Sequence, residues 1–270
     1  MRWRLRRPDL QYLVETLMPQ QANRERTVDL IQDDDRLIGG MLDDERLFRR
    51  LMATEDVLVR VSPWLFFTVL LRRTQRDMER ESFTVERRNR QKVVLFDTGR
   101  VLDLLSREPV RDYLATMLAS FTRIESMTMS VEVSEGVWRT HRTDGLNVEG
   151  LMRYSETTDE PFRFEPYKRI GDVCLFLTGF FPEYIEAQYR YPSSRQLRPR
   201  ARGRVCASRD DYEALGRMFY RLAAEHEMAR MEGLDGVLAA LSEEFVLAEK
   251  PLSLLADRYL QLKRHALFGL

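Results

Sequence analysis

The sequence contains little cysteine and no long apolar run. Its only two cysteines, Cys174 and Cys206, are not in a Cys-x-x-Cys spacing, so neither a disulfide framework nor a structural zinc site is indicated. The longest apolar runs, residues 64–71 and 173–181, are far shorter than the ~20 residues that span a bilayer. The basic start at residues 2–7 is not followed by the apolar segment of a secretory signal. We therefore expect a soluble, cytoplasmic protein that does not enter a membrane.

The sequence also lacks an excess of charge of one sign. It has 43 basic and 43 acidic residues among 270, so no overall field attracts it to nucleic acid or to a membrane surface. Charged residues are nevertheless frequent at 32%, and arginine greatly outnumbers lysine, which is typical of a helical surface with many ion pairs three or four residues apart. With 44% hydrophobic residues, the chain can bury a substantial core without metals or disulfides.

The spacing of apolar residues predicts helices over the first half of the chain, from Leu10 to about Ser126. Ser62-Pro63 is a helix start signal, and the apolar run that follows it should enter the core and leave to solvent at Arg72 and Arg73. Further along, residues 84–92 are expected to be a charged connection and residues 93–105 a helix. Before Ser62, the pair Gly39-Gly40 is expected to separate two helices.

The spacing of apolar residues changes after residue 126 from a helical period to alternation. Residues 127–133 and 137–142 alternate in polarity around Ser134-Glu135-Gly136, which predicts a β-hairpin near residues 127–142. Helices are then expected from Ser208 through Met231, over 237–247 and over 251–267. The predicted fold class is mainly α, a compact multi-helix domain over residues 1–270 with one small hairpin, and a subdivision near residues 126–145 stays open.

The segment Tyr167–Glu183 is an apolar helical run that Pro182 must end or kink. Within it, Asp172 must be solvated, paired or protonated, because a carboxylate is costly among apolar side chains. Lys168 and Arg169 precede Asp172 by four and three residues and can reach it. We favour a structural ion pair here over an acid that binds a ligand, and all three residues are candidates for either role.

The segment 190–209 is rich in arginine and has no acidic residue. Arginine grips phosphate groups and tyrosine stacks on bases, so binding of single-stranded nucleic acid is physically reasonable here. The alternative is a solvated loop whose arginines pair with acidic helices, which the balanced total charge favours. The candidate nucleic-acid-binding residues are Tyr189, Arg190, Tyr191, Arg195, Arg198, Arg200, Arg202 and Arg204.

The motifs of known catalytic sites are missing. The sequence has no glycine-rich phosphate loop, no nucleophile elbow and no dinucleotide fingerprint. His226 stands alone where a zinc protease helix needs two histidines four residues apart, and we expect it to be a packed histidine. The acidic groups at residues 33–35 and 43–45 do not have the spacing of a calcium loop. The sequence thus assigns no catalytic residue, no metal ligand and no cofactor.

The segment Tyr167–Phe181 resembles a scattered group of bacterial proteins with a Tyr-(Lys/Arg)-x-Leu-Gly-Asp-x-x-Leu-Phe-x-x-Gly-Phe-Phe segment, with Ile170 in place of leucine. The similarity continues through residues 215–223, 237–243 and 254–262, and the group has no assigned activity. It implies a bacterial helical protein and supplies no catalytic residues.

The function that we expect from the sequence is that of a non-enzymatic cytoplasmic scaffold, adaptor or regulatory protein. It would act through a protein partner or through self-association into a homo-oligomer, because the chain assembles no reaction-competent group of side chains. Nucleic-acid binding through residues 190–209 is the first alternative. The second is an enzyme or sensor for an anionic small molecule, held by Lys168, Arg169 and Asp172.

Overall fold

Two units make up the chain, one formed by residues 1–123 with 254–270 and the other by residues 124–253. The structure is a computed structural model, and it describes residues 5–80, 84–88, 91–95, 98–122, 127–134, 137–143, 146–185, 208–261 and 263–268. Helices dominate these residues, which confirms the mainly α class. None of the described helices is long and apolar enough to cross a membrane.

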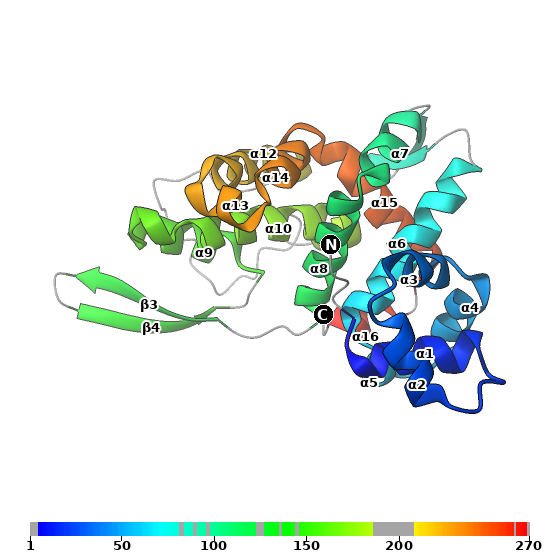
Figure 1. Ribbon diagram of the computed structural model, residues 1–270. Helices are drawn as coiled ribbons and strands as arrows, with labels where there is room; N and C mark the ends of the chain where they lie inside the picture. Colours follow the sequence, from blue (N-terminus) through cyan, green and yellow to red (C-terminus); the bar gives the residue numbers. More distant parts are fainter. Residues whose placement is uncertain are drawn as a thin grey trace. The chain divides into compact units, whose positions relative to one another are not determined.

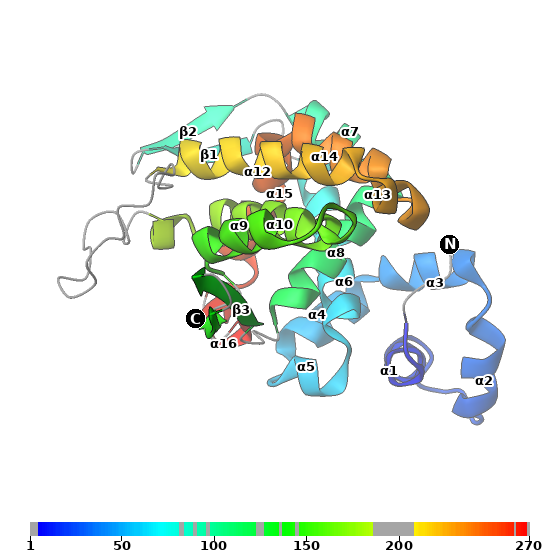
Figure 2. The ribbon, with the colours of Figure 1, turned by 90° about the vertical axis from the view of Figure 1, so that its left-hand side faces the viewer.

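The first unit consists mainly of helices (Figure 1), with one pair of short strands that Figure 2 shows. Its elements are α1 (Arg7–Leu17), α2 (Arg24–Ile31), α3 (Asp35–Leu42), α4 (Glu45–Ala53), α5 (Val57–Arg60), α6 (Pro63–Glu79), β1 (Thr84–Arg88), β2 (Gln91–Leu95), α7 (Thr98–Ser106), α8 (Glu108–Phe121) and α16 (Arg264–Phe268).

Helix α6 forms the core of the first unit. Its residues 64–71 are all buried, and it packs against α7 and α8. The expected exit to solvent at Arg72 and Arg73 is wrong, because their side chains are only 13% and 20% exposed. The Arg72 guanidinium lies 2.7 Å from the Asp43 carboxylate, and Arg73 Nε lies 3.1 Å from Asp77 Oδ1. Ion pairing thus replaces the solvent that these charges would otherwise require.

The second unit has α10 as its central helix. Its elements are β3 (Met127–Ser134), β4 (Val137–Thr143), α9 (Val148–Thr157), the 3-10 helix η1 (Glu160–Phe162), α10 (Phe164–Phe180), α12 (Arg209–Glu225), α13 (Glu227–Glu232) and α14 (Asp235–Glu243). Helix α15 (Phe245–Arg258) contributes residues to both units.

Small residues on α10 allow neighbouring helices to approach closely. Residues 170–180 are all buried, and α12 runs along α10 with α14 against α12 (Figure 2). A Cβ atom at Gly171 would lie 2.6 Å from the Tyr220 ring, and one at Gly179 would lie 2.8 Å from Leu252 Cβ. Such distances are shorter than van der Waals contact, so the packing requires glycine at both positions.

Two antiparallel strand pairs accompany the helices. Strand β3 pairs with β4 at the place of the expected hairpin, with Met127 opposite Thr143 and an irregularity between Glu132 and Ser134. Strand β1 pairs with β2, with Thr84 opposite Leu95. This second pair contradicts the expectation of a charged connection over residues 84–92 and of a helix that begins at residue 93. A short apolar run such as Val93-Val94-Leu95 can belong either to a strand or to the first turn of a helix. The spacing of apolar residues therefore could not assign it.

Other helix boundaries also differ from expectation. The pair Gly39-Gly40 lies inside α3 rather than between helices. The helix expected over residues 208–231 ends at Glu225, because His226 is extended and caps the start of α13. Its Nδ1 accepts a hydrogen bond from the Met228 amide at 3.2 Å. Pro251, expected as a helix start, lies inside α15. Helix α10, in contrast, ends at Phe180, just before the predicted breaker Pro182.

Candidate functional site

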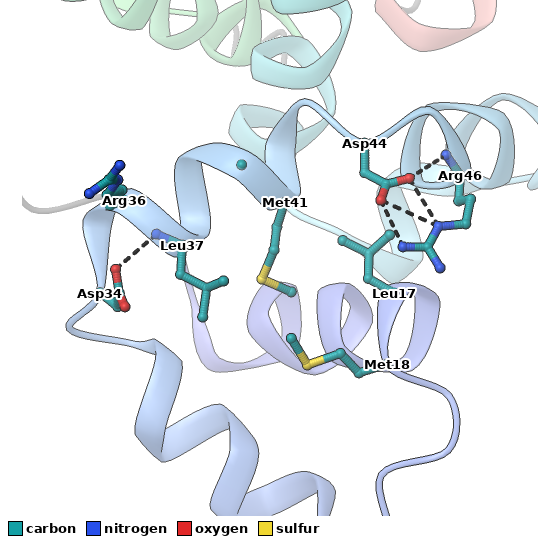
Figure 3. Close-up of a pocket in the computed structure, with 9 residues that line it drawn as sticks. Leu17, Met18, Asp34, Arg36, Leu37, Met41, Asp44 and Arg46 are labelled. Atoms are coloured by element: carbon teal, nitrogen blue, oxygen red, sulfur yellow. Dashed lines mark hydrogen bonds and ion pairs between the residues drawn. The ribbon is translucent and has the colours of Figure 1, made fainter.

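A pocket of about 500 Å³ opens in the first unit beside α1 and α3 (Figure 3). We call it the α1–α3 pocket. Its wall includes the end of α1, the length of α3 and the start of α4. The residues that line it are Leu17, Met18, Asp34, Arg36, Leu37, Gly40, Met41, Asp44 and Arg46.

Apolar side chains form the floor of the α1–α3 pocket. Leu37 and Met41 are four residues apart and therefore project from one face of α3, with Leu37 38% exposed and Met41 5% exposed. Across from them, Leu17 and Met18 end α1 (Figure 3). Gly40 lies on the same wall, and a Cβ atom added there would have no heavy atom within 4 Å. The missing side chain leaves part of the α3 wall hollow.

The acidic side chains in the pocket wall are engaged in helix capping. Asp34 Oδ1 accepts a hydrogen bond from the Leu37 amide at 2.8 Å and so caps α3. Asp44 caps α4 by accepting from the Arg46 amide, and it also accepts from the Arg46 guanidinium at 2.8 Å (Figure 3). These bonds from Arg46 hold the pKa of the Asp44 carboxyl below its usual value. Both carboxylates therefore act structurally, as helix caps.

The pocket does not have the composition of a catalytic or metal site. The described residues that line it include no histidine, cysteine, serine or threonine, so they offer no hydroxyl or thiol nucleophile paired with a histidine base. Among the residues that the structure describes, no group of three or more His, Cys, Asp and Glu side chains could hold a metal ion. An apolar floor with charged ends instead fits the apolar side chains of a bound molecule.

Asp172, the first of the sequence-predicted candidates, lies between α10 and α12 in the second unit. It is 5% exposed, and the Tyr220 hydroxyl donates a hydrogen bond to its Oδ1 at 2.9 Å. The Tyr220 ring packs against Gly171, the residue before Asp172. The carboxylate thus connects the buried helix α10 to α12.

Lys168 interacts with two carboxylates of α10, Glu165 and the expected Asp172. Its Nζ lies 3.1 Å from Glu165 Oε2, one turn towards the start of α10. Burial opposes the charged form of Lys168, but the carboxylates of Asp172, Glu165 and Glu232 outweigh it and raise the pKa of the ammonium group. Arg169 lies next to it on α10. Their role in holding an anionic small molecule stays a prediction.

The candidate nucleic-acid-binding residues, from Tyr189 to Arg204, lie outside the described residues, so their role also stays a prediction. The segment 190–209 ends at Arg209, which is described and begins α12. Arg209 Nε lies 2.9 Å from Glu213 Oε1, and its Nη2 donates to Glu249 Oε2. This arginine is therefore held by two carboxylates. For this one residue, that is the ion pairing with helices that we described as the alternative to nucleic-acid binding.

Glu249 is the most deeply buried carboxylate of this cluster. Its side chain is 1% exposed. Burial raises the pKa of Glu249 to about 7, with the nearby Glu213 carboxylate adding to the rise and Arg209 opposing it.

Comparison with protein-family models, with curated proteins and with solved structures finds no match. The fold and the site described above thus rest on this chain alone, and the similarity of residues 167–181 to bacterial proteins stays a prediction.

Sequence reasoning missed the α1–α3 pocket. Its residues Leu37, Gly40 and Met41 are spaced three and four apart, which is the pattern of an apolar helix face with one side chain missing. Because Gly39-Gly40 was interpreted as a break between helices, this face was not recognised. The opposite wall at Leu17 and Met18 comes from tertiary packing, for which the sequence gives no signal.

Proposed function

We propose that the protein is a non-enzymatic cytoplasmic adaptor or regulatory protein that binds a protein partner through the α1–α3 pocket. The observation that carries the proposal is the pocket itself, which is open, about 500 Å³ in volume and apolar at its floor. Its acidic groups are already engaged as helix caps. Apolar side chains of a partner can therefore bury surface there at about 25 cal/mol per Å² without leaving either carboxylate unpaired.

Two methionine side chains in the pocket wall support the proposed binding function. Met18 and Met41 face the pocket from two helices, and methionine adapts its shape to different partners because its side chain is unbranched and flexible. Binding surfaces that accept varied apolar side chains use methionine for the same reason.

Gly40 allows the pocket to be blocked without disturbing the fold. A tryptophan in Gly40→Trp would enter open space, because nothing lies within 4 Å of the added Cβ. Gly99 in α7 is the matched control, since it is also helical, has equally open surroundings and is not part of the pocket. Circular dichroism and the unfolding midpoint should show that both variants fold.

The test is a selection of helical peptides from a random-sequence display library on the wild-type protein. We expect enriched peptides to bind Gly40→Trp at least tenfold more weakly and to bind Gly99→Trp with unchanged affinity. The ¹³C-methyl signals of Met18 and Met41 should shift on binding, while that of the exposed Met231 should not. If no enriched peptide is sensitive to Gly40→Trp, the proposed function is wrong.

A further inference from the structure

His226 connects three elements of the second unit through one side chain. Its Nε2 lies 3.0 Å from the carbonyl oxygen of Glu160 in η1, and its Nδ1 accepts a hydrogen bond from the Met228 amide in α13 at 3.2 Å. Its ring also contacts that of Phe164, the first residue of α10, with 5.8 Å between the ring centres. We call the imidazole and its two hydrogen bonds the His226 latch.

The two hydrogen bonds of the His226 latch require a neutral imidazole. A carbonyl oxygen can only accept, so Nε2 must carry the hydrogen that it donates to Glu160. A backbone amide can only donate, so Nδ1 must be without a hydrogen to accept from Met228. A second proton would bind to Nδ1, where it would point at the Met228 N–H and remove the cap of α13. The closed latch is therefore incompatible with the imidazolium.

The two short elements that the latch joins carry exposed apolar side chains. Helix α13 has six residues and η1 has three, so neither would be stable by itself. Phe162 in η1 and Met231 in α13 are 72% and 73% exposed, the highest values among the large apolar side chains described in the second unit. Opening of the latch would therefore release the elements that present these two side chains.

We propose that the His226 latch is a pH-sensitive switch. The neutral imidazole holds η1 and the first turn of α13 together, and a proton at Nδ1 breaks the bond from Met228 and lets α13 open locally. Histidine changes its charge between about pH 5 and pH 8. Phe162 and Met231 are thus held in one arrangement by the neutral latch and move independently in acid. This inference concerns the second unit alone and does not rest on the proposed function.

Charged side chains of both signs stand on the elements around the latch. The basic ones are Arg163, Lys168 and Arg230, and each has a partner elsewhere. The acidic ones are Asp159, Glu160, Glu165, Glu225, Glu227 and Glu232. Among the described residues, none of these side chains forms an ion pair or a hydrogen bond with the imidazole. The proton therefore acts on the latch through the two ring nitrogens.

The ring nitrogens of His226 report the state of the latch directly. At about pH 8 their ¹⁵N shifts should show a hydrogen on Nε2 and none on Nδ1, and at about pH 5 both should carry one. Hydrogen exchange, corrected for its intrinsic dependence on pH, measures the opening. From the high to the low pH, we expect the α13 amides to lose protection about tenfold, which is the size of effect that loss of a helix cap produces. The amides of α10 should keep theirs.

Two substitutions of His226 separate titration from capping. His226→Asn keeps an oxygen that can accept from the Met228 amide but does not titrate, so α13 should be equally protected at both pH values. His226→Ala removes the cap, and α13 should then exchange rapidly at both. His265→Asn is the matched control, because His265 is an exposed histidine of the first unit. It should keep the pH dependence of the wild-type protein.

Three outcomes would overturn the inference. They are a hydrogen on Nδ1 at about pH 8, equal protection of wild-type α13 at both pH values, and an unchanged pH dependence in His226→Asn. The first two are measured on the wild-type protein, so the inference is tested even where a substitution prevents folding. None of them involves the α1–α3 pocket, so the proposed function is judged separately by its own peptide selection.

Discussion

Tyr220 and Gly171 show how single residues decide the packing in the second unit. The tyrosine ring occupies the space that a side chain at residue 171 would need, and this position brings its hydroxyl to Asp172. Asp172 is consequently a buried acceptor whose hydrogen bond from Tyr220 depends on the glycine immediately before it. Loss of either contact should lower stability, because a hydrogen bond within a protein contributes about 0.5–1.5 kcal/mol.

Gly171→Ala tests this arrangement. The added methyl group would lie 2.6–2.9 Å from three ring atoms of Tyr220, so the ring must move and its bond to Asp172 must lengthen or break. We expect the free energy of unfolding to fall by about 2–4 kcal/mol, from overpacking and the lost hydrogen bond. Urea unfolding followed by circular dichroism measures it.

Gly236→Ala is the control for the general effect of replacing a helical glycine. Nothing lies within 4 Å of a Cβ atom at Gly236, and this residue is in the first turn of α14. The change should be neutral or should stabilise the protein by up to about 1 kcal/mol. Equal effects of the two substitutions would contradict the role given to Tyr220.

At the scale of elements, Glu249 makes the junction of α12 and α15 depend on pH. Arg209 at the start of α12 holds Glu249 of α15, and burial raises the pKa of this carboxyl to about 7. The unfolded chain has the ordinary value near 4.5. Between these values the folded state keeps a proton that the unfolded state has lost, so this group's contribution to stability is full below about pH 4.5 and is lost as the pH rises through 7.

Glu249→Gln should remove this dependence, because glutamine resembles the protonated carboxyl at every pH. Relative to the variant, we expect the wild-type protein to lose on the order of 1–3 kcal/mol of unfolding free energy between pH 5 and pH 8. Glu227→Gln, at an exposed position, corrects for the removal of one carboxylate. Parallel pH profiles for the wild type and Glu249→Gln would show that Glu249 does not titrate in this range.

Elements were predictable from sequence where local signals were strong. Ser208 and Asp211 form the predicted capping box of α12, and Ser62 with Pro63 begins α6 as expected. The break at His226 was missed because the apolar stripe continues through it, whereas the actual break is stabilised by a side-chain cap that the helical period does not reveal.

The candidate site depended on tertiary structure, and for that reason sequence reasoning selected other residues. Asp172 was correctly expected to need a partner, but Tyr220 lies 48 positions further along the chain and the nearby Lys168 was the more obvious choice. Leu17 and Leu37 line one pocket only because α1, α2 and α3 pack together. Long-range contacts of this kind leave no periodic pattern in one sequence.

At the scale of the whole molecule, the first unit is built from two separate segments of the chain. Its residues come from 1–123 and 254–270, while residues 124–253 form the second unit as one continuous stretch. Within the first unit, the C-terminal residues are bonded to the earlier part, since Lys263 Nζ donates to the Met52 carbonyl at 3.1 Å and the Phe268 ring stacks on Phe67. The first unit is therefore complete only after the second has been synthesised.

This division predicts that a destabilising change acts mainly within its own unit. Gly171→Ala should speed hydrogen exchange of the α10 and α12 amides by the factor that corresponds to its loss of stability, which is about tenfold for each 1.4 kcal/mol. Leu70→Ala, at a fully buried position of α6, should do the same for α6 and α8. Native-state exchange with mass spectrometry resolves both regions in one experiment.

Since α15 contributes residues to both units, its amides should respond to both substitutions. Uniform acceleration over all described helices by either variant would instead establish one cooperative domain over residues 1–270, as the sequence first suggested.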